Sequence, residues 1–275
     1  MKRMKIMGLA LVAVFALVAF AAASASATPA FYECAKESGG KYEKGCGKEG
    51  GKGGYTLKVG TGKGKASKSK GGPANLEVVV PPGVSAEFPE GATIHIECAS
   101  NKGVSTNVAP NLVEKAVTTF SKCKVLGSPC QSGSKKETIV TNPLAGELVD
   151  IVGGSGVGTA LKAETGTSTA AFVCTEVAET NVVGSLIGVN TGNVGTFSKT
   201  SALTFSVGPG LGEVEYAPGH KYVPEVNVPT DKTGGTPGEH YLVSEISKEK
   251  VFVGGLPSGQ TQSVEVKGED IEILP

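Results

Sequence analysis

The segment Thr93-Ile94-His95-Ile96-Glu97-Cys98 alternates polar and apolar side chains with a period of two. This alternation is typical of a half-buried β-strand, because successive side chains of a strand point to opposite faces of the sheet. Similar short runs, rich in Val, Ile and Thr and bounded by Gly, Pro, Ser or Asn, occur on both sides of it. They cover residues 75–80, 116–120, 138–141, 147–152, 170–177, 182–189, 202–207, 213–216, 241–246, 251–253, 263–266 and 270–273.

These runs predict an all-β fold, an antiparallel Greek-key β-sandwich over residues 73–275. The window 111–119 has β-branched residues in its second half and is also predicted as a strand. The chain contains 40 glycines, which disfavours long helices. The glycines follow no three-residue period, which excludes collagen.

The first residues have the pattern of a secretory signal peptide. A basic start, Met1–Lys5, precedes an apolar run over 8–23 and the small residues Ala25-Ser26-Ala27. This pattern predicts a signal peptide over 1–27 with cleavage after Ala27, and a secreted, extracytoplasmic protein. The alternative is an uncleaved membrane anchor, but the apolar run is short for a span and no basic residues follow it. The only Arg and all three Met lie in this leader, and the chain has no Trp.

Six cysteines follow the leader, and an even number in an exported chain predicts three disulfides. The alternative is a zinc site, but no CxxC pair occurs and the three histidines are not at ligand spacing. Six cysteines allow many pairings, so their spacing alone does not establish connectivity. We predict two bridges that close short loops and one that joins two strands: Cys34–Cys46, Cys123–Cys130 and Cys98–Cys174.

A shift in composition divides the chain. Residues 28–70 contain ten lysines and four glutamates, a net charge of +6, whereas residues 71–275 carry a net charge of −9. The composition of Lys70-Gly71-Gly72-Pro73 is typical of a turn or linker. We therefore predict a signal peptide (1–27), a Gly/Lys-rich, disulfide-stapled N-terminal segment (28–72) and the β-sandwich domain (73–275). The main apolar contacts of the N-terminal segment are expected from Tyr32, Tyr42 and Tyr55.

Lysines of the N-terminal segment are candidate ligands for anions. A lysine ammonium is a mobile point charge that neutralises phosphate groups in a salt-dependent way. The predicted partners are anionic cell-wall polymers or a membrane surface, and the alternative is a purely solubilising face. Specific nucleic-acid recognition is not expected, because bidentate Arg is absent. We expect deletion of residues 48–70 to abolish anion binding and to leave the sandwich folded. The candidate residues are Lys52, Lys58, Lys63, Lys65, Lys68 and Lys70.

No catalytic set is assembled in the sequence. The segment 153–157 lacks the last glycine of a nucleophile elbow, and Ser132 and Lys135 have SxxK spacing without a predicted helix. The glycine-rich stretch 60–65 lacks phosphate-loop spacing, and three scattered aspartates do not form a calcium loop. We predict a non-catalytic protein without cofactor or metal, a structural or binding module associated with the cell envelope. The alternative is a secreted hydrolase whose site is assembled from scattered His, Glu and Ser residues, such as His95, His220, His240, Glu213, Glu215, Glu245 and Glu249.

Several short motifs occur in a fixed order along the chain: Glu33-Cys34, Gly40-Lys41-Tyr42, Cys46, Gly54-Tyr55, Ile96-Glu97-Cys98, Thr119-Phe120, Cys123, Pro129-Cys130, Ile139–Leu148 and Gly184–Gly188. Their order resembles a large set of paralogous secreted proteins of unknown function from high-GC soil actinobacteria. The resemblance covers most of the mature chain, and departs from the set at 48–70 and 234–239. It implies export and β architecture, and it carries no activity, ligand or catalytic residue.

The segment Ile139–Leu148 also has a physical interpretation of its own. Pro143 restricts Asn142 to extended backbone. Gly146 permits a tight bend, and Leu144 and Leu148 can both enter a core. The segment therefore predicts a strand–turn–strand corner, with a ligand loop as the alternative.

Overall fold

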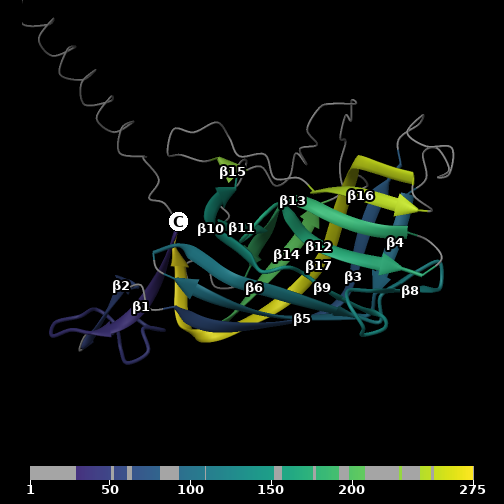
Figure 1. Cartoon of the computed structure of the whole chain (residues 1–275). Helices are drawn as coiled ribbons and strands as arrows, with labels where there is room; N and C mark the ends of the chain where they lie inside the picture. The colour runs from purple at the N-terminus through teal and green to yellow at the C-terminus, as the bar shows by residue number, and fades with distance from the viewer. Residues whose placement is uncertain are drawn as a thin grey trace, which may run out of the picture.

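A computed structural model describes residues 29–50, 53–60, 64–80, 93–108, 110–151, 157–175, 178–191, 198–207, 229–230, 242–248 and 251–274. These residues form strands and no helix (Figure 1). The strands are β1 (Ala30–Lys36), β2 (Tyr55–Val59), β3 (Lys65–Val79), β4 (Thr93–Cys98), β5 (Ser100–Val108), β6 (Leu112–Ser121), β7 (Lys124–Val125), β8 (Ser128–Gln131), β9 (Thr138–Val140), β10 (Leu144–Ile151), β11 (Val157–Ala163), β12 (Ser168–Cys174), β13 (Ala178–Thr191), β14 (Ser198–Val207), β15 (Pro229–Thr230), β16 (Leu242–Lys248) and β17 (Val251–Leu274).

The strand pairings are antiparallel and close into two rings. In the first ring, hydrogen bonds join β3, β5, β6, β10, β11, β13, β14 and β17 in this order, and β17 pairs with β3 again. In the second ring the order is β3, β4, β7, β8, β12, β13, β16 and β17. The predicted all-β antiparallel fold is confirmed. Its sheets are joined along their edges, so the ring strands have few unpaired edges.

The long strand β3 belongs to both rings and changes its neighbour midway. It pairs with β5 as far as Gly71 and with β4 from Ala74 onward. Gly72 and Pro73 lie at the change, where proline is tolerated because the ladder is interrupted there. The predicted linker over 70–73 is therefore wrong: the predicted domain boundary falls inside a strand of both rings.

The other two shared strands also change neighbours at glycines. Strand β13 pairs with β12 and β16 as far as Gly184, and with β11 and β14 beyond it. Gly184 has a φ of 114°, which other residues rarely adopt. In β17, the pairing with β16 ends at Ser258 and the pairing with β14 begins at Gln260. The three partner changes together define the border between the rings.

The N-terminal segment docks on the first ring. Strand β1 pairs with β2 on one side and with the C-terminal end of β17 on the other. Phe31 is 5% exposed and belongs to the core of the first ring, whereas Tyr32, Tyr42 and Tyr55 are only half-buried. Phe31, rather than the predicted tyrosines, therefore supplies the main apolar contact. The predicted disulfide Cys34–Cys46 is confirmed.

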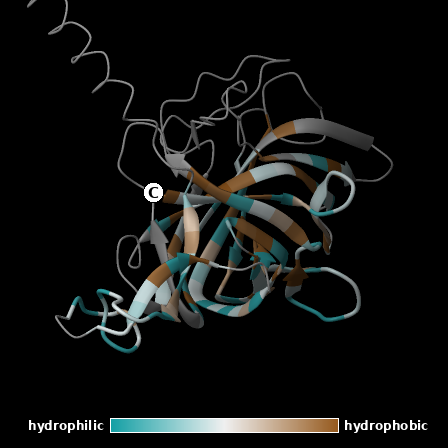
Figure 2. Ribbon diagram, turned by 90° about the vertical axis from the view of Figure 1, so that its left-hand side faces the viewer, coloured by the Kyte–Doolittle hydropathy of each residue, from teal (hydrophilic) through white to brown (hydrophobic). Residues whose placement is uncertain are grey.

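Each ring has its own apolar core, and hydropathy alternates along many of the described strands (Figure 2). The first core includes Leu148, Leu161 and Phe205, and the second includes Ile96 and Phe120. Both cores contain residues of the predicted corner at 139–148: Leu144 and Leu148 in the first and Ile139 in the second. The corner joins β9 to β10, as predicted, but Gly146 lies inside β10, opposite Leu161, and does not form the predicted bend.

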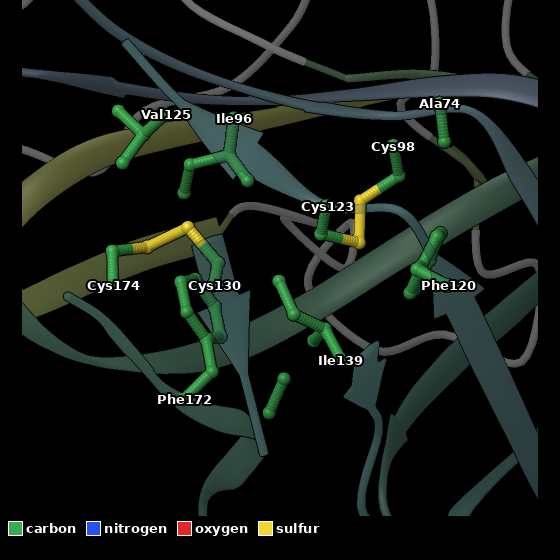
Figure 3. Close-up of a cluster of buried hydrophobic side chains, with 11 residues drawn as sticks. Ala74, Ile96, Cys98, Phe120, Cys123, Val125, Cys130, Ile139, Phe172 and Cys174 are labelled. Carbon is green, nitrogen blue, oxygen red and sulfur yellow. A yellow bond between two sulfur atoms is a disulfide. The ribbon is translucent and has the colours of Figure 1, made fainter. Parts of the chain in front are cut away.

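The other four cysteines lie together in the second core (Figure 3). They form the disulfides Cys98–Cys123 and Cys130–Cys174, so the predicted bridges Cys98–Cys174 and Cys123–Cys130 are wrong. Cys130 and Cys174 are directly opposite in the β8–β12 pairing, with their Cα atoms 3.9 Å apart. The β4–β7 pairing of Glu97 with Lys124 likewise brings Cys98 next to Cys123, at a Cα separation of 4.0 Å. Neighbouring strands, rather than short loops, decided the connectivity.

Candidate functional site

Four of the six lysines predicted to bind anions lie among the described residues, three of them on β3 and one on β2. Lys52 and Lys63 lie outside the described residues. Lys65 is half-buried on β3. It is two residues from Ser67, which is 3% exposed, and so lies on the same face of the strand. Only Lys68 and Lys70 remain as exposed lysines of the same strand. The sixth candidate, Lys58, lies on β2.

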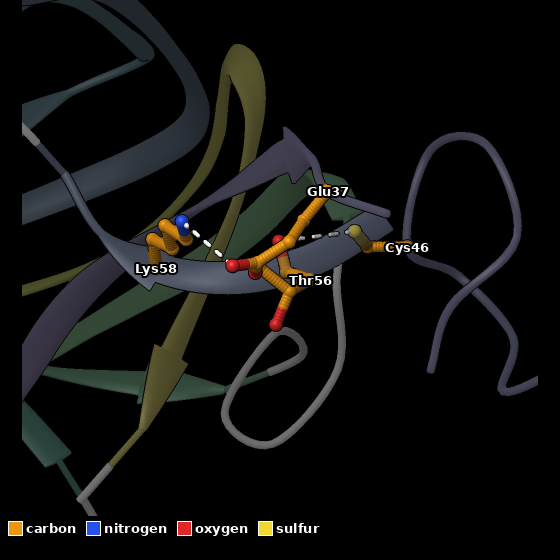
Figure 4. Close-up of polar contacts among 4 residues, drawn as sticks. All are labelled: Glu37, Cys46, Thr56 and Lys58. Atoms are coloured by element: carbon orange, nitrogen blue, oxygen red, sulfur yellow. Dashed lines mark hydrogen bonds and ion pairs between the residues drawn. The ribbon is translucent and has the colours of Figure 1, made fainter. Parts of the chain in front are cut away.

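Lys58 has a charged partner within the N-terminal segment. Its Nζ lies 3.3 Å from Glu37 Oε1, and both side chains are about half exposed (Figure 4). Glu33 is also its cross-strand partner in the β1–β2 pairing. Nearby, Cys46 Sγ lies 3.8 Å from the Thr56 carbonyl oxygen, a packing contact because a disulfide sulfur has no hydrogen to donate. Lys58 therefore contributes to local charge balance rather than to a free basic surface.

Strand pairing places two further lysines beside Lys68 and Lys70. Lys102 of β5 is directly opposite Lys70, and Lys267 of β17 is directly opposite Lys68. Directly opposite residues have Cβ atoms about 5 Å apart and point to the same face of the sheet. We call these four lysines of three adjacent strands, Lys68, Lys70, Lys102 and Lys267, the basic face.

The basic face lies on the outer surface of the first ring. Along β3, β5 and β17 its lysines alternate with Ser69, Gly103 and Val266, which line the interior. Lys68, Lys70, Lys102 and Lys267 are all classed as exposed. Successive side chains of a strand point to opposite faces, which places the lysines outside and the residues between them inside the ring. The lysine side chains thus remain accessible to a partner from solution.

The basic face carries more positive charge than its neighbours neutralise. Glu265 is the acidic residue within it: its Oε1 lies 2.7 Å from Lys267 Nζ, and it is also opposite Lys70. Four lysines and one glutamate leave a net charge of +3. Like charges directly opposite on adjacent strands destabilise a sheet. An anion bound here would relieve that repulsion, and salt would weaken its binding.

The sequence did not reveal Lys102 and Lys267 as part of this site. The stretch 100–108 is too rich in Ser, Asn and Gly to be recognised as a strand. The predicted strand at 263–266 ended just before Lys267, whereas β17 continues to Leu274. No signal in the sequence indicates that β5 and β17 flank β3, because that pairing is long-range.

The candidate catalytic residues do not assemble into a site in the described part of the chain. His95 Nδ1 lies 3.5 Å from Glu77 Oε1, but the histidine side chain is 55% exposed and no hydroxyl of a described residue bonds to it. Ser132 Oγ donates to the Ala171 carbonyl at 2.8 Å and accepts from Val140 N at 3.2 Å. The hydroxyl of the SxxK motif is therefore hydrogen-bonded to backbone. Glu245 accepts from Asn181 Nδ2 at 2.8 Å. The residues His220, His240, Glu213, Glu215 and Glu249 lie outside the described ranges.

Neither a metal-binding cluster nor a membrane-spanning helix occurs among the described residues. No group of three or more His, Cys, Asp or Glu side chains is arranged to hold a metal ion there. In the same part of the chain, no helix has the length and hydrophobicity needed to cross a membrane. The predicted leader over 1–27 is outside the described residues.

Comparison with known proteins assigns neither a family nor a function to the chain. No family model matches the chain, and no curated protein or solved structure is found to match it. The interpretation of the basic face therefore depends on its chemistry.

Proposed function

We propose that the protein is an exported, non-catalytic binding module that attaches to anionic polymers of the cell envelope. The observation that carries the proposal is the basic face, in which four exposed lysines of adjacent strands are accompanied by one glutamate. Export is supported by the leader pattern and by three disulfides, which persist in oxidising compartments.

Phosphate-rich polymers of the teichoic type fit the basic face. Lysine binds phosphate as a point charge and does not require the planar geometry of arginine. Lys68 and Lys70 are two residues apart on one strand, a spacing of about 7 Å. Lys102 and Lys267 add positive charge on the two neighbouring strands, β5 and β17. This array favours a repeating anion over a single small one.

A membrane surface fits the same face less well. Stable peripheral attachment combines a basic patch with a second, apolar contact. Val104, which is 53% exposed and opposite Lys68, is the one large exposed apolar side chain next to the basic face among the described residues. We therefore assign the face to a polymer and treat vesicle binding as an outcome of the test.

The test compares retention on immobilised glycerol-phosphate polymer with binding to vesicles containing anionic lipid. The double variant Lys68→Glu/Lys102→Glu should lose retention at low salt. The matched control, Lys135→Glu/Lys162→Glu, makes the same change in net charge at exposed lysines away from the face and should remain bound. Wild type should elute at moderate salt, because the contacts are exposed and screened.

Two results would contradict the proposal. Equal loss of retention in both double variants would show that net charge alone is responsible. Binding to anionic vesicles without retention on the polymer would show that the face recognises a lipid surface.

Deletion of residues 48–70 was expected to leave the sandwich folded, but the structure predicts a different result. Residues 65–70 form the start of β3, a strand of both rings. Deleting 48–70 would remove backbone pairings to β5 and β17 and unfold the sheet. Point substitutions are therefore the appropriate variants.

A further inference from the structure

The first ring encloses a cavity between its walls. Its volume is about 80 Å³, and its lining includes side chains of β1, β3, β5, β6, β11, β13, β14 and β17. A second cavity, of about 50 Å³, extends toward the second ring. Thr118, Leu161, Phe205 and Gln262 line both, so the two spaces adjoin. Closed rings of about eight strands leave interiors that are either filled by side chains or hold one small ligand.

The lining of the first cavity is uncharged and of mixed polarity. Phe205, Leu161 and Val264 supply apolar surface, and serines, threonines and asparagines supply polar atoms. Lys, Asp, Glu and His are absent from the residues that line the first cavity, and Glu77, whose carboxylate is paired with His95, is the one charged residue that lines the second. A buried ion without a partner is strongly disfavoured, so these walls suit a neutral molecule.

Four polar side chains of this lining, Ser67, Asn107, Thr159 and Asn190, bond to one another or to backbone. Asn107 Nδ2 donates to Ser67 Oγ at 3.2 Å. Asn190 Nδ2 donates to Thr159 Oγ1 at 3.1 Å and to the Val157 carbonyl at 3.2 Å. These bonds hold the Asn107 and Asn190 side chains against the walls.

Gln262 is the lining residue among those described that has a buried polar atom without a hydrogen-bond partner. It is 5% exposed, and its Oε1 is buried and accepts no hydrogen bond from the described residues. The β17–β3 register shifts between Gln262 and Val264, where β3 has one extra residue between Gly71 and Ala74. A buried acceptor without a donor destabilises a fold. Because Gln262 lines both cavities, its Oε1 can accept a hydrogen bond from a donor group of a bound molecule.

We propose that the adjoining cavities bind one small neutral molecule with a ring-sized apolar body and one hydroxyl or N–H group. The polar hydrogen is donated to Gln262 Oε1, and the ring packs against Phe205 and Leu161. The combined space is comparable to the cavity of about 150 Å³ that holds benzene in a protein core. This site is inside the ring and is independent of the basic face, so either proposal can fail without the other.

The experiment uses three probes of similar size on the oxidised full chain. Phenol has a ring and a donor, toluene has the ring without a donor, and benzoate carries a charge. Titration calorimetry should give saturable binding of phenol, about tenfold weaker binding of toluene and none of benzoate. Tenfold corresponds to one hydrogen bond in a buried site.

Variants assign the selectivity to Gln262. Gln262→Met preserves side-chain length and should lower phenol affinity about tenfold, with toluene affinity unchanged. It should also raise the denaturant midpoint of the free protein, because it removes the unpartnered oxygen; a glutamine with only a structural role would lower it. Gln131→Met makes the same substitution on β8, outside both linings, and should not change binding.

A second variant tests the cavity from another strand. Ser201→Leu of β14 places a larger side chain in the first cavity and should weaken phenol and toluene alike. The proposal is overturned if wild type binds neither probe saturably, or if it binds phenol and toluene equally. It is also overturned if Gln262→Met folds and leaves the ratio of phenol to toluene affinity unchanged.

Discussion

Cys123 and Cys130 are neighbours across the β7–β8 hairpin, yet each is bonded to a cysteine of another strand. The backbone N–H of Cys130 donates to the Cys123 carbonyl at 3.0 Å, while the sulfurs bond to Cys98 and Cys174. The hairpin is thereby attached covalently on both sides. Its backbone pairings are short: one residue pair joins β4 to β7 and two join β8 to β12. The disulfides reinforce two of the three shortest pairings of the second ring.

Peptide mapping can test this connectivity directly. Trypsin cleaves after lysine, and lysines separate the four cysteines of the second core into different peptides. Non-reducing digestion followed by mass spectrometry should link Cys98 to Cys123 and Cys130 to Cys174. Recovery of a Cys98–Cys174 or Cys123–Cys130 peptide from folded protein would contradict the structure.

Removing one of these bridges should open the second ring first. The double variant Cys98→Ala/Cys123→Ala leaves a single backbone pair between β4 and β7. Its free energy of unfolding should fall by about 2–4 kcal/mol. Hydrogen exchange should show lost protection in β7 and β8 and retained protection in β11 of the first ring. Uniform loss of protection would argue against separate rings.

The tip of the same hairpin contains an unfavourable residue. Leu126 has a φ of 48°, is 95% exposed and is followed by Gly127 at 85°. Two positive φ values define a type I′ turn, for which Asn-Gly is the preferred pair. Leu126→Asn should therefore raise the free energy of unfolding by about 1 kcal/mol in urea denaturation. Gly127→Ala should lower it, and an equal response of both variants would contradict the assigned turn.

Stability and binding should respond in opposite directions at Lys102. Its opposite partner is Lys70, so Lys102→Glu replaces repulsion with attraction and should add about 0.5 kcal/mol at low salt. The gain should disappear at high salt, and polymer retention should decrease. Lys162→Glu is the control, because its cross-strand neighbours, Ala145 and Ser185, are uncharged. The same stabilisation in both variants would disprove repulsion within the basic face.

Phe31 should be the residue that attaches the N-terminal segment to the first ring. Phe31→Ala removes a 5%-exposed aromatic side chain from the core and should cost about 3–5 kcal/mol in chemical denaturation. Tyr32→Ala removes a half-buried ring of similar size and should cost clearly less. Equal losses would show that the segment is not attached through Phe31.

The sequence alone was sufficient for features that depend on local patterns. Alternation at 93–98 identified β4 to the residue, and the Pro143 corner located the break between β9 and β10, although β10 begins at Leu144 rather than at the predicted residue 147. These predictions succeed because side-chain period and proline geometry act on neighbouring residues. The pairing of Cys34 with Cys46 succeeded for the same reason, since both lie within one small loop.

Only the tertiary structure decided which distant residues meet. Polar strands such as β5, and β3 before Gly71, have weak apolar periodicity, because one face is exposed and the other lines a partly polar interior. Their strand conformation is imposed by backbone hydrogen bonds to neighbours that are far away in sequence. The same long-range register placed Lys102 and Lys267 beside Lys68 and Lys70, paired Cys98 with Cys123, and buried Gln262 between two cavities. A period-two pattern tells which face a residue occupies, but pairing across strands determines its neighbours.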